Sequence, residues 1–150
     1  MNIVYLFNSS LPSYNANSLQ VVNVCHNIAK YIGQITLITP NTGLKKTIFS
    51  HYGLDKNFKT LKIKYFNSFP RGLKYYLFSI VSIIYSFKLK PDFFITRNYF
   101  TLFLLILLRK KVIFEVHSSL EIEGRLINFI YNNFSIFNSK NFVNLIFINN

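Results

Sequence analysis

The strongest constraint on the fold is a strand–helix–strand pattern at the start of the chain. Residues 2–7 form a short apolar run rich in β-forming residues, and residues 34–39 form a second one. Between the two runs, Val21, Cys25 and Ile28 recur at the spacing of one helix face. Two strands joined by a helix in this way run parallel, with a right-handed crossover. The opening of the chain therefore predicts a parallel sheet covered by helices.

Local signals predict where these first elements begin and end. Asn17 is a favourable N-cap residue for the helix, and Gln20 follows three residues later in the capping-box position. Gly33 is expected at the C′ position, just after the helix ends. Pro40 is expected to end the second strand, because proline cannot donate a ladder hydrogen bond.

The alternation of strands and helices continues to the end of the sequence. Apolar runs predict further strands at residues 60–66, 92–96, 111–116 and 142–148. Helical patterns predict helices at residues 70–88, 99–108 and 123–137, with a short one near 46–52. The chain has 150 residues, of which 51% are hydrophobic, which is enough for one buried core. We therefore predict one Rossmann-like, three-layer α/β domain over residues 1–150, with a parallel sheet of about six strands.

The charge of the chain narrows the choice of partners. The net charge is +12, but the lysines and arginines are scattered in small groups along the sequence. No recognition-helix, zinc-knuckle or RNP-like motif accompanies them, so nucleic acid is not an expected partner. An anionic membrane surface and phosphorylated substrates both stay open, and the membrane is favoured because basic groups flank apolar segments.

Two apolar runs need to be tested as membrane spans. Residues 75–87 and 99–108 are both shorter than the roughly 20 residues that cross a bilayer. The helix predicted at 70–88 is apolar nearly all round, so it can be a core helix or lie against lipid between its basic ends. Cys25 is the only cysteine, which excludes an intrachain disulfide and suits a reducing compartment. We expect a cytoplasmic protein, with peripheral contact at the inner membrane face.

Candidate site residues follow from the rule that ligands bind at the carboxyl ends of the strands of a doubly wound sheet. The rule points to the loops at residues 8–17, 40–43, 97–98 and 117–123. No G-x-G-x-x-G sequence is present, so a dinucleotide cofactor is not expected, and the His and Cys spacing predicts no metal site. The polar candidates within these loops are Asn15, Asn17, Ser18, Arg97, Asn98 and His117.

These candidates differ in the chemistry that they offer. Small polar residues such as Asn17 and Ser18 can cap the first helix or meet an anion or sugar hydroxyls at its positive end. Arg97 can bind a phosphate or a sugar acid, or it can be an ordinary surface arginine. His117 steps off a buried strand, and Glu115 alternates with it, so both side chains can face the same side of the sheet.

Together these segments resemble the N-terminal domain of glycosyltransferase family 4, which has the GT-B fold. The matching segments are residues 2–6, 12–22, 35–40, 52–54, 92–98 and 112–117. The resemblance implies a nucleotide-sugar-dependent transferase that moves a hexose-type sugar to a polysaccharide or glycolipid acceptor. It implies no metal and no cofactor besides the nucleotide-sugar co-substrate.

The resemblance also implies roles for single residues. His117 matches the catalytic-pocket histidine that lies near the transferred sugar, and Asn17 and Ser18 match the loop near the donor phosphates. Arg97 matches an arginine of similar sequences. The family's glycine pair in the first loop is missing here, and so is a C-terminal donor-binding domain, so we expect little transferase activity from these residues alone. The alternative is a non-catalytic Rossmann-like module that docks to a membrane or to a partner chain.

Overall fold

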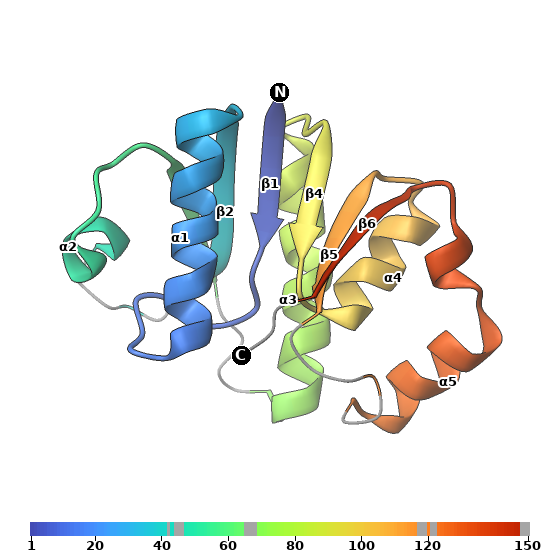
Figure 1. Ribbon diagram of the computed structural model, residues 1–150. Coiled ribbons are helices and arrows are strands. Elements are labelled where there is room, and N and C mark those ends of the chain that lie inside the picture. Colours follow the sequence, from blue (N-terminus) through green and yellow to red (C-terminus); the bar gives the residue numbers. More distant parts are fainter. Residues whose placement is uncertain (42, 44–46, 65–68, 117–119, 121–122, 148–150) are drawn as a thin grey trace.

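The computed structural model describes residues 1–41, 43, 47–64, 69–116, 120 and 123–147. Its centre is a six-stranded sheet in the order β3-β2-β1-β4-β5-β6 (Figure 1). Every pair of neighbouring strands is parallel. In chain order the strands are β1 (Asn2–Leu6), β2 (Gln34–Asn41), β3 (Lys59–Lys64), β4 (Phe93–Thr96), β5 (Val112–Val116) and β6 (Phe142–Phe147). The prediction of a Rossmann-like α/β domain with about six parallel strands is confirmed.

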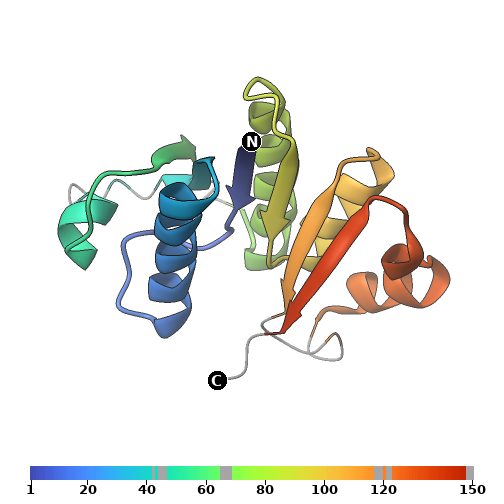
Figure 2. The ribbon, with the colours of Figure 1, turned by 45° about the horizontal axis from the view of Figure 1, so that its top comes forward.

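Helices cover both faces of the sheet and make three layers. The helices are α1 (Ala16–Tyr31), α2 (Ile48–Tyr52), α3 (Arg71–Phe87), α4 (Tyr99–Leu107) and α5 (Arg125–Asn133). Helix α1 lies on one face and α3 and α4 lie on the other, as the two ribbon views show (Figures 1 and 2). A short 3-10 helix, Ile136–Asn138, precedes β6.

Two hydrophobic cores hold these layers together. Tyr5, Cys25 and Leu37 belong to the core between α1 and the sheet. Phe94 and Phe114 belong to the larger core under α3, α4 and α5. Neighbouring side chains along a strand enter opposite cores, because strand side chains alternate between the two faces.

The start of α1 differs from the prediction. Asn15, not Asn17, is the N-cap residue, and it makes no side-chain capping bond. The prediction that Asn17 caps α1, with Gln20 in the capping-box position, was therefore wrong. The reason is tertiary, because the side-chain oxygen of Asn17 accepts a hydrogen bond from Arg97 instead of capping the helix. Gly33 does follow the C-cap residue Ile32.

Gly33 is needed there because of a close approach and not because of its backbone angles. A Cβ atom at this position would lie 2.7 Å from the carbonyl oxygen of Met1, closer than real Cβ atoms come to backbone. The same oxygen accepts a hydrogen bond from the Gln34 amide at 3.1 Å. The glycine thus lets the end of α1 pass next to the start of β1.

Two further boundaries were predicted wrongly. Pro40 does not end β2, which runs to Asn41. The last residue of β1, Leu6, pairs with Ile38, so β1 does not reach Pro40. Pro40 pairs only with Ile63 of β3. The N–H group that proline lacks therefore removes no hydrogen bond between β2 and β1. The helix expected at 123–137 is shorter, because the backbone becomes extended at Phe134 before the 3-10 helix inserts Ile136 into the core.

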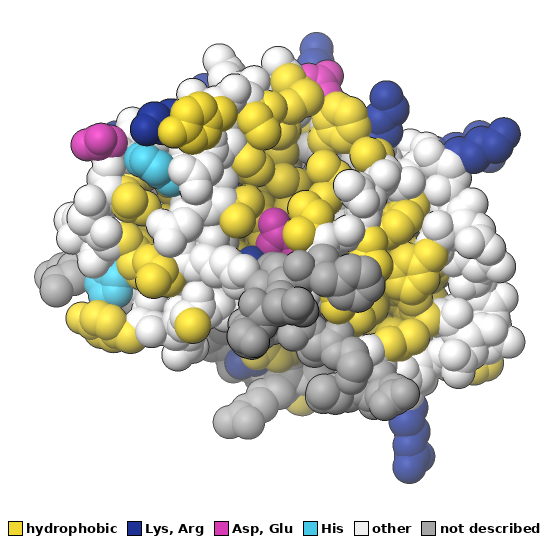
Figure 3. Space-filling view, viewed as in Figure 1, with side chains coloured by type: hydrophobic (Ala, Val, Ile, Leu, Met, Phe, Trp, Pro, Cys, Tyr) yellow, Lys and Arg dark blue, Asp and Glu magenta, His cyan; other side chains and the backbone are white. Residues whose placement is uncertain are grey.

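The half of the sheet that α1 does not cover has hydrophobic side chains at its surface. Figure 3 is viewed from the α1 side and shows them over β4, β5 and β6. Val143 and Ile146 of β6 are both exposed. Within the described residues, no helix is both long enough and apolar enough to cross a membrane.

Candidate functional site

The candidate site is a cavity of about 310 Å³ at the carboxyl ends of β1 and β4. These two strands are neighbours at the centre of the sheet, where the order of the strands reverses. Ligands of doubly wound sheets bind at this switch point. The cavity is lined by Leu6, Phe7, Asn8, Ser9, Asn17, Tyr75, Arg97, Asn98 and Glu123.

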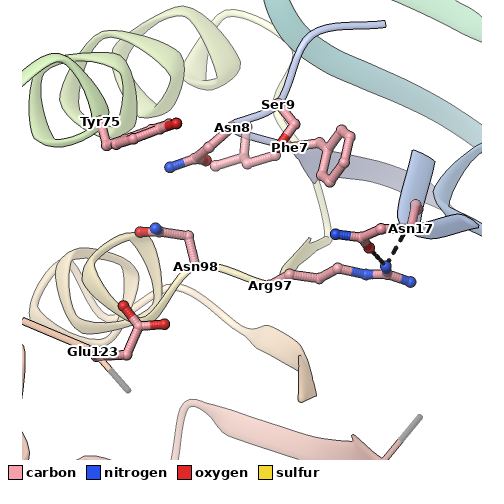
Figure 4. Close-up of a pocket in the computed structure, with 9 residues that line it drawn as sticks. Phe7, Asn8, Ser9, Asn17, Tyr75, Arg97, Asn98 and Glu123 are labelled. Atoms are coloured by element: carbon pink, nitrogen blue, oxygen red, sulfur yellow. Dashed lines mark hydrogen bonds between the residues drawn. The ribbon is translucent and has the colours of Figure 1, made fainter. Parts of the chain in front are cut away.

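One wall of the cavity comes from the chain that leaves β1 and from α3. The Asn8 amide nitrogen donates to the Ser79 hydroxyl at 3.3 Å, which ties the first loop to α3. The Oδ1 atom of Asn8 is buried and has no partner among the described residues. Figure 4 shows the Tyr75 ring extending from α3 toward Asn8. This wall therefore presents an amide and a phenol to a ligand.

The opposite wall is the start of α4. The side-chain oxygen of Asn98 accepts from the Thr101 amide at 2.9 Å, so Asn98 is the N-cap residue of α4. The Thr101 hydroxyl donates to the same oxygen at 3.1 Å and also lies 2.9 Å from Ser79 on α3. Because the side-chain oxygen of Asn98 is bonded to the amide and the hydroxyl of Thr101 in the same helix, the capping role of Asn98 fixes its position at the cavity edge.

Behind the cavity lies a buried ion pair that joins three strands. The Nε atom of Arg97, just after β4, donates to Oε2 of Glu115 on β5 at 2.8 Å. The Tyr5 hydroxyl on β1 donates to the same oxygen at 2.8 Å. The side chains of Arg97 and Glu115 are only 6% and 3% exposed. Arg97 is therefore not a surface arginine, and Glu115 compensates its charge.

Arg97 also joins the sheet to the first turn of α1. Its Nη1 group donates to the side-chain oxygen of Asn17 and to the Asn17 carbonyl oxygen, the latter at 3.4 Å (Figure 4). Its Nη2 group is buried without a hydrogen-bond partner among the described residues. The guanidinium group thus keeps the two N–H bonds of Nη2 for a ligand or a water molecule, while its orientation is fixed by Glu115 and Asn17.

The same buried network changes the proton affinity of two groups. Burial raises the pKa of the Tyr5 hydroxyl and of the Cys25 thiol well above their ordinary values of 10.0 and 9.0. The negative charge of Glu115 acts in the same direction on both groups, while Arg97 opposes it. Both side chains are therefore held in their neutral forms by the fold.

These raised pKa values predict a loss of stability in alkali. The folded chain holds both protons more tightly than the unfolded chain, so this contribution is complete below about pH 9 and falls as the pH rises beyond it. We expect the free energy of unfolding, measured with urea by circular dichroism, to fall from about pH 9 upward for this reason. The double variant Tyr5→Phe/Cys25→Ala should lose less stability than the wild type between neutral and alkaline pH. Equal losses in both proteins would contradict the prediction.

The structure brings three of the predicted site residues to the cavity. Asn17, Arg97 and Asn98 line it. Asn15 is exposed at the N-cap of α1 and Ser18 is buried, and neither lines the cavity. His117, the predicted catalytic residue, lies outside the described residues.

Three of the four loops predicted from the sequence contribute lining residues to the cavity, and the described residues of the loop at 40–43 do not, but several lining residues were not among the candidates. Asn8 directly follows the apolar run at residues 2–7, within one of the predicted loops, and its polar side chain after that run was the available signal. Glu123 was predicted to be the first residue of a helix at 123–137, yet it lies before α5 and lines the cavity. Tyr75 belongs to a helix whose sequence pattern gave no sign of a site.

The chemistry of the lining suits an uncharged, hydroxyl-rich ligand. Its hydrogen-bonding groups are mostly amides and hydroxyls, the charge of Arg97 is balanced by Glu115, and the carboxylate of Glu123 disfavours an anionic ligand. The described residues contain no group of three side chains able to hold a metal ion. A volume of about 310 Å³ lies at the lower end of the range for small-molecule sites. The cavity therefore fits a sugar-sized ligand better than a dinucleotide.

Comparison with known proteins gives structural neighbours only. No family model matches the sequence, and no match is found among curated proteins. MurG of Acinetobacter baumannii is similar with a TM-score of 0.55 and 12% identity, over 79% of this chain and 37% of that one. The UDP-GlcNAc 2-epimerase of Neisseria meningitidis, bound to UDP-GlcNAc, has a TM-score of 0.55 and 11% identity, over 88% of this chain and 34% of that one.

A third neighbour is UGT73P12 of Glycyrrhiza uralensis, complexed with glycyrrhetinic acid 3-O-monoglucuronide. Its TM-score is 0.50 at 18% identity, over 79% of this chain and 28% of that one. The chain thus spans about a third of the length of these proteins. At such low identity the likeness shows the fold alone, which is a Rossmann-like unit of the kind that forms half of a GT-B fold.

Proposed function

We propose that residues 1–150 are the N-terminal, acceptor-side half of a nucleotide-sugar-dependent glycosyltransferase similar to family 4. In this proposal a C-terminal domain binds the donor, and the two halves together transfer a hexose-type sugar to a polysaccharide or glycolipid. No metal or further cofactor takes part. By the resemblance, His117 would act next to the transferred sugar, and Asn17 and Ser18 would belong to the loop near the donor phosphates.

The observation that carries the proposal is the cavity at the switch point between β1 and β4. Its position is where doubly wound sheets bind ligands, and its amide and hydroxyl lining suits sugar hydroxyls. The neighbours support the proposal further, because one of them is an epimerase bound to UDP-GlcNAc. The absence of a glycine-rich loop agrees with a half that binds acceptor more than donor phosphates.

Sugar binding to the cavity is the first test. We expect saturation-transfer NMR with a panel of methyl pyranosides to detect binding of at least one of them to the 150-residue chain. Asn8→Ala should weaken that binding by roughly 2- to 10-fold, the value of one hydrogen bond. Tyr75→Phe should weaken it by a similar factor, because the phenol faces the cavity.

The matched control for Tyr75→Phe is Tyr85→Phe on the same helix. Tyr85 does not line the cavity, so this variant should bind the pyranoside as the wild type does. If no pyranoside binds, or if the Tyr75 and Tyr85 variants behave alike, the cavity is not a sugar site and the proposal fails. Donor turnover by the 150-residue chain alone would contradict the proposed division between two domains.

A further inference from the structure

Helix α3 turns its small polar side chains toward the sheet. Ser79, Ser82 and Ser86 are fully buried on its inner face. Their hydroxyls are satisfied within the helix, since they donate to the carbonyl oxygens of Tyr75, Ser79 and Ile83. These serines lie beside the buried core residues Phe78 and Ile83, so the inner face of α3 is mixed and its outer face lacks the polar residues usual for a surface helix.

The outer face of α3 carries a continuous apolar stripe. Leu73, Ile80, Ile84 and Phe87 are 45%, 42%, 56% and 38% exposed, and half-buried Leu77 lies between the first two. Their spacing of four and three residues places all of them on one side of the helix. At the neighbouring end of α4, Leu107 and Leu108 are exposed as well. An apolar stripe this long is unusual on a free surface, and it marks a docking site.

Charged residues around this stripe are almost all basic. Between Arg71 and Phe114 the only acidic residue is Asp92, whose carboxylate accepts from the Asn2 amide at 2.7 Å. The basic residues in this segment, apart from buried Arg97, are Arg71, Lys74, Lys88, Lys90, Arg109, Lys110 and Lys111. This composition complements an anionic surface and disfavours a basic one.

A second cavity of about 310 Å³ lies at the carboxyl-terminal ends of α3 and α4. It is lined by Phe87, Lys90, Pro91, Phe94 and Lys110. The Lys110 ammonium group lies 5.2 Å from the centre of the Phe87 ring, which belongs to the stripe. Two lysines that line a cavity together with two phenylalanines, directly beside exposed apolar side chains, match the junction between a lipid phosphate and its acyl chains.

Two of the basic residues occupy backbone positions that favour glycine. Lys90 and Arg109 follow the ends of α3 and α4 with φ angles of 46° and 56°. Residues with a Cβ atom are disfavoured in this left-handed region, where glycine or asparagine usually follows a helix. Both basic side chains therefore stand at positions where stability alone would favour glycine.

We propose that the outer face of α3, with the ends of α3 and α4, docks on an anionic lipid bilayer. The stripe enters the interfacial region, and Lys90 and Lys110 bind a headgroup phosphate in the second cavity. The Lys88 ammonium group lies 5.6 Å from the centre of the Tyr85 ring, which is suited to the boundary between headgroups and acyl chains. This docking does not depend on whether the cavity at β1 and β4 binds a sugar.

Co-sedimentation with vesicles tests the proposal on the intact chain. We expect binding to phosphatidylglycerol–phosphatidylcholine vesicles and much weaker binding to phosphatidylcholine alone. Each basic residue near an anionic surface strengthens binding about fivefold, so Lys90→Gly/Arg109→Gly should bind roughly 25-fold more weakly. Glycine relieves the left-handed backbone at both positions, so this variant should be at least as stable as the wild type. The matched control is Lys56→Gln/Lys59→Gln, which removes two exposed charges near β3 and should bind almost normally.

The apolar contribution needs its own variant. Ile80→Gln/Ile84→Gln should lose about tenfold or more in vesicle affinity, and the loss should persist at about 0.5 M salt, where charge attraction is screened. If both charge-removing pairs weaken binding equally, the attraction is unspecific and the proposal is wrong. The proposal is also wrong if the wild-type chain binds no vesicles. One such outcome is a dimer, seen by sedimentation velocity, that the Ile80→Gln/Ile84→Gln variant does not form. In that case the stripe is an interface between two copies.

Discussion

Replacing Glu115 with leucine should lower the free energy of unfolding by about 3–5 kcal/mol, because it leaves a buried arginine without its counter-charge. Both side chains of the pair are nearly inaccessible, so water cannot take the place of the carboxylate. The substitution also removes the acceptor of the Tyr5 hydroxyl. Urea unfolding at neutral pH, followed by circular dichroism, measures the loss.

The double variant Arg97→Met/Glu115→Leu is the control for this prediction. It removes both charges and should recover a large part of the stability, because an apolar pair of similar volume needs no compensation. A double variant as unstable as Glu115→Leu would mean that packing, and not charge, accounts for the loss. A single variant within about 1 kcal/mol of the wild type would show that the pair is solvated.

Phe114→Ala should lower the free energy of unfolding by about 3–5 kcal/mol through the cavity that it leaves in the larger core. Phe114 is fully buried on β5, and its ring centre lies 4.7 Å from that of Tyr99 on α4. Neighbouring strands and helices fix the walls of the space, so they can close it only in part. The same urea titration measures the effect.

Phe129→Ala provides a control of identical chemistry at an exposed position. Phe129 lies on α5 and is 62% exposed, so its removal should change the free energy of unfolding by less than about 1 kcal/mol. Similar losses for the two phenylalanine variants would contradict the assignment of Phe114 to a closely packed core.

Most of the fold could be predicted from the sequence, because it follows from the spacing of hydrophobic residues and from the order of strands and helices along the chain. All six strands and the main helices follow from apolar runs, and parallel pairing follows from the helices between the strands. The errors came from contacts between residues distant in sequence. Asn17 has the chemistry of a capping residue, but Arg97, eighty residues later, binds its side chain.

The site was predicted only in outline for the same reason. The carboxyl-end rule selected the loops that contain Asn8, Arg97 and Glu123. It could not predict that Glu115 would neutralise Arg97, since strand spacing shows which face a side chain takes but not its partner on another strand. The sequence likewise left open whether the helix at 70–88 faces the core or lipid. Its serines turned out to mark the inner face of α3.

The strand order has a consequence for how the chain is made. β1 is synthesised first, but it lies at the centre of the sheet, and its contact with β4 joins residues about ninety positions apart. At roughly 5–20 residues per second, a ribosome needs several seconds to deliver the second neighbour of β1. During that time β1, β2 and β3 can already pair, with α1 packed on them, while the backbone N–H and C=O groups on the other edge of β1 stay unpaired. A nascent chain halted before residue 93 should therefore be a better chaperone substrate than the finished domain.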